Sequence, residues 1–461
     1  MEDLAQIAIS TALDEGVSFS DIRIEDTHLT RIEINNGVSK TSLGAQLKGA
    51  GIRAFIDGAW AFAHTTNFTQ EGMRQIGRKV AKTALAIRNH VAESFALSGP
   101  SFQDKMELKV KKNLQDISEE EKMALTKMLD EEVRSVDQRI ENTRTIYQDN
   151  VTRLSIFNSW GTNVSITNSL PRLILRVTAK ENGQRQRAWG QIAGRGGFEV
   201  LNETEARNIA RKSGELAIEL LSSKPAKGGT YDVIIDPPLN AAMVHEAFGH
   251  PCEADNWVAE KTVLEGKLGE RLGPDFLNIS DDPNVPGWRG SFEYDWEGTK
   301  TQKRCLIKNG ILTDLMHSLE TASRLGMTPN GAARCQSFMF EPIPRMSNTF
   351  MERGDWDVQE MIEDTGSGIL LCDYNYGYTD SSKGQFMFQA SYGYLIENGE
   401  KSQMIRDVSV AGQIIEFLSK IDAIGNDFGL SAGTCGKGEQ MIPDNSGGPH
   451  ARIRQVPLGG M

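Results

Sequence analysis

The stretch KPAKGGTYDVIIDPPLNAAMVHEAFGH, residues 224–250, decides how the second half of the chain folds. Its first six residues are rich in Lys, Pro and Gly, which is typical of a linker. The run YDVIID that follows is short, has an aliphatic centre and is closed by two prolines, so it predicts a buried strand. A helix is predicted from about Asn240. We therefore expect a domain boundary near residue 226, with one domain over residues 1–225 and another over residues 226–461.

Upstream of this stretch, helical and alternating patterns follow one another. Apolar residues recur at helical spacing in four segments, at about 3–15, 69–90, 118–136 and 203–222. Two segments alternate between apolar and polar side chains in the way that half-buried strands do, 21–64 and 140–200. The fold class predicted for the chain is α+β, and its N-terminal region, which could form two subdomains, carries antiparallel strands.

Downstream, strand patterns dominate. They fall near 303–307, 369–373 and 385–396, and the chain is rich in glycine from Gly429 onward. We expect a mostly β C-terminal domain that carries a metal-binding helix. In the strand at 385–396, the apolar residues Phe386, Phe388 and Ala390 alternate with other side chains. Such a strand can lie in the core or form an open edge that pairs with an extended peptide, and both remain open at this point.

Composition and charge exclude several classes of protein. The 461 residues include 50 Lys and Arg against 62 Asp and Glu, so the net charge of −12 disfavours direct nucleic-acid binding unless a basic patch is segregated. Five scattered cysteines form no CxxC pair, which indicates a reducing compartment. The first residues lack a signal-peptide pattern, and no run approaches the 18 or so apolar residues of a membrane span. We therefore expect a cytoplasmic protein without membrane contact.

One motif carries chemistry. Residues 245–250 read His-Glu-Ala-Phe-Gly-His, an HExxxH pattern. Two imidazoles can hold a metal ion, and the carboxylate of Glu246 can act as general base on a water beside it. In a regular helix, a five-residue step turns the second imidazole about 140° away from the first. His245 and His250 can therefore chelate one ion only if the helix contains a π-bulge or ends before His250.

A catalytic metal site needs a third protein ligand. The candidates are Glu253, Asp255, His317 and Cys435. Cys435 lies in Gly-Thr-Cys-Gly-Lys-Gly, where small neighbours allow close approach of an ion and Lys437 could favour the thiolate. A buried structural cysteine is equally compatible with this pattern.

Several segments together resemble the TldD/PmbA family of metalloproteases. They occur in the family's order across nearly all of residues 226–461: HEAFGH with the following Glu-Ala-Asp, PGWRGSFEYDWEGT at 286–299, IKNGIL at 307–312, PRMSNTFM at 344–351, GQFMFQASYGYLIENG at 384–399 and GTCGKG at 433–438. The N-terminal half shows the family's helix and strand pattern, with GAGIRAFIDGAWAFAHT at the expected place. Because the PmbA-like branch lacks the metal-binding histidines, this chain looks like the TldD branch.

The resemblance implies a zinc peptidase. It implies zinc held by His245, His250 and Cys435, with Glu246 as the catalytic carboxylate. It also implies a dimer, formed with a second copy or with a PmbA-type paralogue, whose cavity takes unfolded peptides that add to a sheet edge. Cys252 follows His250 closely and is the alternative sulfur ligand.

Two residues of the PRMSNT segment could bind substrate, namely Arg345 and Asn348. A structural Arg–carboxylate pair and a turn Asn are equally compatible with that segment.

Two other functions stay open. One is a non-catalytic interaction protein that modulates a partner such as DNA gyrase, a role also attributed to the family. The other is a metallohydrolase that acts on a small amide. Replacing Glu246 with Gln would leave the first function intact and abolish either hydrolase activity.

Overall fold

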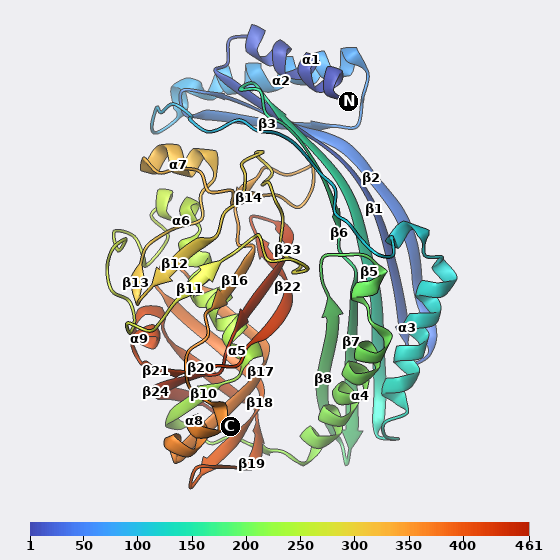
Figure 1. Ribbon diagram of the computed structural model, residues 1–461, viewed down its shortest axis with the longest axis vertical. Helices are drawn as coiled ribbons and strands as arrows, with labels where there is room; N and C mark the ends of the chain where they lie inside the picture. Colours follow the sequence, from blue (N-terminus) through green and yellow to red (C-terminus); the bar gives the residue numbers. More distant parts are fainter. Residues whose placement is uncertain (461) are drawn as a thin grey trace.

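The computed structural model describes residues 1–460, and its N-terminal half is built on one eight-stranded sheet. The strands follow the order β3-β2-β1-β5-β6-β4, with β7 paired to β5 and β8 paired to β7. Their bounds are Phe19–Asn35 (β1), Val38–Ile56 (β2), Ala59–Thr65 (β3), Gln103–Met106 (β4), Ile140–Asn158 (β5), Asn163–Ser169 (β6), Arg172–Glu181 (β7) and Gln184–Ala193 (β8). The three longest strands curve, so the sheet forms an arch (Figure 1).

Four helices cover the outer face of this arch (Figure 1). They are α1 (Glu2–Asp14), α2 (Gln70–Ile87), α3 (Glu119–Arg134) and α4 (Glu203–Glu219). Three begin at a side-chain cap, because Thr69, Ser118 and Asn202 each accept a hydrogen bond from a backbone N–H in the first turn. The short 3₁₀ turns of this half are η1 (Arg88–His90), η2 (Leu114–Asp116), η3 (Phe198–Val200) and η4 (Leu220–Ser222).

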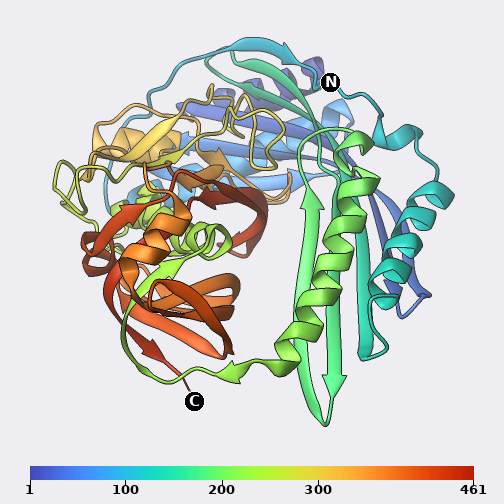
Figure 2. The ribbon, with the colours of Figure 1, turned by 60° about the horizontal axis from the view of Figure 1, so that its bottom comes forward.

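The C-terminal half lies on the inner side of the arch and contains two larger sheets (Figures 1 and 2). The first has the order β17-β10-β24-β20-β18-β19-β9, with β21 on β24, and it closes on itself because β17 also pairs with β18. Its bounds are Lys224–Pro225 (β9), Gly229–Ile235 (β10), Ser367–Asp380 (β17), Gln385–Glu397 (β18), Glu400–Arg406 (β19), Val408–Gln413 (β20), Ile421–Ile424 (β21) and Ala451–Gly459 (β24).

The second sheet has six strands in the order β13-β12-β11-β16-β23-β22. Its bounds are Ile279–Asp281 (β11), Arg304–Lys308 (β12), Ile311–Leu312 (β13), Asn348–Met351 (β16), Gly429–Lys437 (β22) and Gln440–Gly448 (β23). The remaining elements are β14 (Ala333–Arg334), β15 (Ile343–Pro344), α6 (Ala254–Val258), α7 (Leu319–Leu325), α8 (Val358–Thr365) and α9 (Ile414–Ser419).

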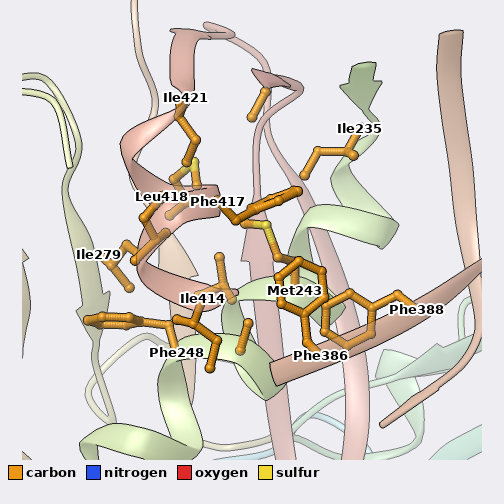
Figure 3. Packing of buried hydrophobic residues seen from close by; sticks show 14 of the residues in the cluster. Ile235, Met243, Phe248, Ile279, Phe386, Phe388, Ile414, Phe417, Leu418 and Ile421 are labelled. Atoms are coloured by element: carbon orange, nitrogen blue, oxygen red, sulfur yellow. The ribbon is translucent and has the colours of Figure 1, made fainter. Parts of the chain in front are cut away.

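The largest hydrophobic core surrounds a central helix of the C-terminal half. This helix consists of α5 (Pro237–Met243), the π-helical turn η5 (Val244–Gly249) and the 3₁₀ turn η6 (His250–Cys252). Met243 and Phe248 from the helix pack among apolar side chains that include Phe386 and Phe388 of β18 (Figure 3). The buried side of the helix is thereby held in place, so the histidines it carries have defined positions.

The predicted α+β class, with antiparallel strands followed by a mostly β half carrying the motif helix, is confirmed. Of the two possibilities left open for residues 385–396, the core strand is the one observed, and β18 is not an open edge. It pairs with β17 on one side and with β19 and β20 on the other, and Phe386, Phe388 and Ala390 are buried. The division into domains 1–225 and 226–461 stays a prediction. No helix within residues 1–460 is long and apolar enough to cross a membrane.

Candidate metal centre

The central helix brings His245 and His250 together through its π-helical turn. Asp236 caps α5 by accepting from the N–H of Leu239, and two prolines occupy the first helical positions. The helix then widens at residues 244–249, so that the two imidazole centroids lie 5.1 Å apart. Of the two geometries left open by the sequence, the π-helical turn is the one observed, and the chain continues helically through Pro251.

Glycine is required at one position of this turn. A Cβ at Gly249 would lie 2.0 Å from Sδ of the buried Met346. The loop that carries Met346 can therefore pack directly on the helix backbone, which places the π-helical turn tightly against the rest of the core.

Cys435 of β22 completes a three-residue cluster. Its Sγ lies 3.3 Å from Nε2 of His250. One side-chain donor atom from each of His245, His250 and Cys435 lies within 4.8 Å of the others. Two nitrogens and one sulfur, with room for a fourth ligand, are the donor set of a catalytic zinc site.

The second nitrogen of each imidazole is held by a neighbouring oxygen. Nδ1 of His250 lies 2.8 Å from Oε2 of Glu253, which is fully buried. Nδ1 of His245 lies 3.1 Å from Oγ of Ser446 and 3.1 Å from Oδ2 of Asp444. Carboxylates in this position orient zinc-binding histidines, because they keep the proton on Nδ1 and leave Nε2 free to bind the ion.

The electrostatics of the cluster fit a cation. Burial alone would raise the pKa of the Cys435 thiol, but the neighbouring imidazoles lower it to about 6. Burial opposes the charged form of His250, yet Glu253 and Cys435 raise its pKa to about 10. A thiolate and two carboxylates around two imidazoles therefore form a buried site that favours positive charge, and a divalent ion would supply it.

Glu246 faces a cleft beside this cluster. The cleft has a volume of about 320 Å³ and is lined by Glu246, His250, Glu253, Asn256, Gly377, Tyr378, Thr379, Ser381, Gly436 and Lys437. Oε2 of Glu246 lies 3.9 Å from Nε2 of His250, and its side chain is 31% exposed. The carboxylate can therefore reach both solvent and the position of an ion.

The other candidate ligands have different contacts. Asp255 binds Nζ of Lys437 at 2.7 Å, and the same ammonium lies 3.0 Å from Glu253. Lys437 is therefore paired with these two carboxylates. The groups that favour the thiolate of Cys435 are the imidazoles of His245 and His250 and not Lys437, which the sequence suggested for this role. His317 lies apart from the cluster, near Thr321, and Cys252 is buried in the hydrophobic core. Among residues 1–460 the cluster of potential metal ligands consists of His245, His250 and Cys435.

Arg345 and Asn348 are not accessible to a substrate in this structure. Arg345 is 1% exposed, and its guanidinium donates to the carbonyl oxygen of Cys435 and lies 3.7 Å from Glu253. Asn348 is fully buried, where its amide donates to Asp282 O and Ser291 Oγ. Of the two roles left open by the sequence, these contacts favour the structural one, because both side chains position the loops around the cluster.

The sequence analysis missed Asp444 and Ser446, although a signal existed. Both lie on β23, which returns antiparallel to β22 after the tight turn at Gly438 and Glu439. In that register Cys435 faces Ile442 and Gly433 faces Asp444, so residues 435 and 444 project from one face of the hairpin. A hairpin prediction from this turn would have placed Asp444 near Cys435.

Comparisons with known proteins point to one family. Models of the PmbA/TldA metallopeptidase domains match residues 20–88 (domain 1), 112–221 (central domain) and 228–460 (C-terminal domain). The chain is 34% identical over 448 residues to a metalloprotease of Methanothermobacter thermautotrophicus, covering 97% of both chains. It is 28% identical over 458 residues to a zinc metalloprotease TldD homologue of Saccharolobus solfataricus, covering 98% of this chain and 99% of the relative.

The fold is also found in a solved structure. A Thermotoga maritima protein named as a candidate modulator of a DNA gyrase superimposes with a TM-score of 0.81 at 24% identity, covering 99% of this chain and all of the other. At this level of identity the similarity establishes the shared fold alone.

Proposed function

Because the chain belongs to the PmbA/TldA metallopeptidase family, we propose that it is a zinc-dependent peptidase that cleaves extended, unfolded polypeptides. The observation that carries the proposal is the convergence of His245, His250 and Cys435, with each Nδ1 held by a buried oxygen. A structural pair of helix histidines would need neither a sulfur donor nor a carboxylate behind each ring. The donor set and the open cleft together favour a catalytic zinc site over a purely structural one.

The residues of the site have distinct roles in this proposal. Zinc bound there would polarise the peptide carbonyl and make an adjacent water more acidic. Glu246 would accept the proton of that water at a carboxylate oxygen and deliver it to the leaving amine nitrogen. Glu253 and Asp444 would hold the two imidazoles with Nε2 toward the cleft. Burial of the cluster strengthens these interactions because the local dielectric constant is low.

Open strand edges flank the cleft and support an extended substrate. β10 ends at Ile235, opposite Leu371, so the later part of β17 pairs with β18 alone within the described residues. β22 likewise pairs only with β23 in the part of the chain described. Residues 377–379 of β17 and 436–437 of β22 line the cleft. A peptide could add main-chain hydrogen bonds to either edge, which provides affinity without strict side-chain selection.

We include a dimer in the proposal, formed by two copies or with a PmbA-type paralogue, and a cytoplasmic location. Large apolar side chains on the strands beside the cleft support a partner: Tyr376, Tyr378, Leu430 and Met441 are each 43–65% exposed. Exposed apolar groups of this size are typical of surfaces that another chain covers. Such a cover would restrict access to unfolded chains.

The test combines metal analysis with digestion of an unstructured peptide. We expect about one zinc per chain in the wild type and in Glu246→Gln, with cleavage by the wild type only. Cleavage of small amides but not of peptides would favour an amidohydrolase. Zinc-free protein that binds a partner equally well with Glu246 or Gln would favour a non-catalytic interaction protein.

A further inference from the structure

One face of the β7–β8 hairpin is basic and turned toward the C-terminal half. Leu173, Leu175 and Val177 of β7 pack with residues of α4 in the core behind the sheet. Because side chains alternate along a strand, Arg172 and Arg176 lie on the opposite face. That face is turned to the inner side of the arch (Figure 2).

The neighbouring strand extends this basic face. In the β7–β8 register, Arg176 is paired with Trp189 and Thr178 with Arg187. Arg187 therefore projects from the same face as Arg172 and Arg176. We call these three arginines, together with Arg289, the arginine stripe.

The stripe lacks carboxylate partners. Among residues 1–460, no acidic oxygen lies within 4.0 Å of the guanidinium groups of the stripe, whereas Lys180 and Arg185 of the same hairpin both pair with Glu141. The chain has 62 Asp and Glu against 50 Lys and Arg, so the lack of carboxylates near these arginines does not reflect a shortage of acidic residues. Arg172 donates only to neutral groups, namely Oε1 of Gln191 and Oγ1 of Thr434. The positive charges of the four arginines therefore have no carboxylate beside them, which indicates a binding surface for anions.

Arg289 shows the strongest need for an anion. It is 9% exposed, and its Nε and Nη1 atoms have no hydrogen-bond partner. Burial and the neighbouring charge of Arg172 lower its pKa to about 10, opposed by Asp444. Oδ2 of Asp444 is already engaged by His245. A buried guanidinium with unused donors is costly, and a carboxylate would satisfy two of them at once.

The stripe begins beside the cluster of His245, His250 and Cys435. Nη1 of Arg172 donates to Oγ1 of Thr434 at 3.1 Å, and Thr434 directly precedes Cys435. Nε2 of Gln191 donates to the carbonyl oxygen of Ala432 on the same strand. From there to Arg176 is four residues along β7, or roughly 13 Å, the length of four residues of an extended peptide.

We propose that the arginine stripe binds carboxylates of the peptide substrate, contributed by acidic side chains or by the chain terminus, and so makes the enzyme selective for anionic peptides. The inference rests on the proposed peptidase function for the identity of the ligand. It goes beyond that function because binding along a strand edge by itself is indifferent to side-chain charge.

Equilibrium binding separates this proposal from catalysis. The probes are four fluorescent versions of one unstructured peptide, with two Glu or two Gln, and with a free or amidated C-terminus. Fluorescence anisotropy would measure their affinity for full-length Glu246→Gln protein, in which turnover is expected to be slower by on the order of 10²-fold or more. We expect the most anionic peptide to bind about tenfold more tightly than the Gln, amidated peptide, with the difference shrinking at high salt. Weaker binding of the peptides that carry Gln in place of Glu would identify acidic side chains as the source of the preference. Weaker binding of the amidated peptides would identify the C-terminal carboxylate.

Variants assign the effect to the stripe. In the Glu246→Gln background, Arg176→Gln and Arg187→Gln should each reduce the ratio of the affinities for the anionic and the neutral peptide several-fold. Arg211→Gln on α4, which removes the same charge from an arginine paired with Glu132, should change neither affinity. With Glu246 present, kcat/KM should likewise be higher for the anionic peptide than for the neutral one.

Three results would overturn the proposal. The first is equal affinity for all four peptides, and the second is equal weakening of all four by the stripe variants. The third is displacement of the peptide by a mixed-sequence oligonucleotide whose own binding is lost in the stripe variants. Failure of the peptidase function is distinguishable, because it would abolish cleavage while the charge preference in binding persisted. Cleavage without charge preference would refute the stripe alone.

Discussion

The carboxylate of Glu253 lies 2.8 Å from Nδ1 of His250, and this contact directs the other nitrogen of the ring toward Cys435. Glu253 is fully buried and also faces Lys437 and Arg345. Burial alone would raise the pKa of this carboxyl group. The positive charges of Lys437, His250 and Arg345 outweigh burial and lower the pKa to about 2. Glu253, which follows the motif closely, therefore orients His250 and lies outside the cluster of His245, His250 and Cys435. The consequences can be measured.

Replacing Glu253 with Gln should weaken zinc binding by about 10- to 100-fold, because the orienting carboxylate is lost. Stability should fall by about 3–5 kcal/mol, because buried positive charges lose their partner. Zinc titration and chemical denaturation test both effects. Asp255→Asn, which removes a carboxylate from Lys437 but not from His250, is the matched control. Unchanged zinc affinity in Glu253→Gln would contradict the orienting role.

Replacing Cys435 with Ser should strongly reduce the zinc content, because serine is a poor ligand at neutral pH. Cys252→Ser should keep its zinc, since Cys252 lies in the hydrophobic core and outside the cluster. Elemental analysis of the purified variants decides between them. The reverse pattern would assign the sulfur ligand to Cys252.

Replacing Glu246 with Gln should lower turnover by on the order of 10²-fold or more while zinc is retained. The amide keeps the shape of the side chain but cannot accept the proton. Single-turnover rates on a fluorogenic peptide, measured beside metal content, separate the two effects. A near wild-type rate would eliminate Glu246 as the general base.

His317 should make folding less favourable at acidic pH. Burial, assisted by Arg304, lowers its pKa to about 4, whereas an unfolded histidine titrates near about 6.5. Between about pH 4 and pH 6.5, His317 is protonated in the unfolded chain but neutral in the folded protein. The free energy of unfolding therefore has its full value above about pH 6.5 and decreases as the pH falls toward 4. The loss should reach about 3 kcal/mol.

The measurement is the difference in unfolding free energy between wild type and His317→Gln across this pH range. The variant should lose part of the acid-side decline. His28→Gln, at a side chain that is 46% exposed, should leave the decline unchanged. Parallel pH curves for wild type and His317→Gln would refute the prediction.

Selectivity for unfolded substrates should be visible with one small protein. The denatured and trapped form should be cleaved, while the native form should resist, because a folded domain cannot offer an extended backbone to β17 or β22. A free peptide of the same sequence serves as the reference for accessible bonds. Equal rates on native and denatured forms, with cuts inside structured elements, would contradict the proposal.

Local structure and the identity of the motif could be predicted from the sequence. Helix positions follow from apolar periodicity and caps such as Ser118, and both are properties of neighbouring residues. The five-residue spacing of His245 and His250 already required either a π-helical turn or an early helix end. These inferences succeed because they depend on interactions within a few residues of the chain.

The tertiary structure decided everything that depends on distant pairings. Cys435 meets His250 across 185 residues, and Asp444 reaches His245 only through the β22–β23 register. Whether a strand is central or an edge depends on its neighbours, which is why β18 proved central and the later part of β17 open. Burial likewise turned Arg345 from a candidate substrate contact into a structural one. Sequence periodicity records which face of an element is apolar, but only the packed fold determines what that face meets.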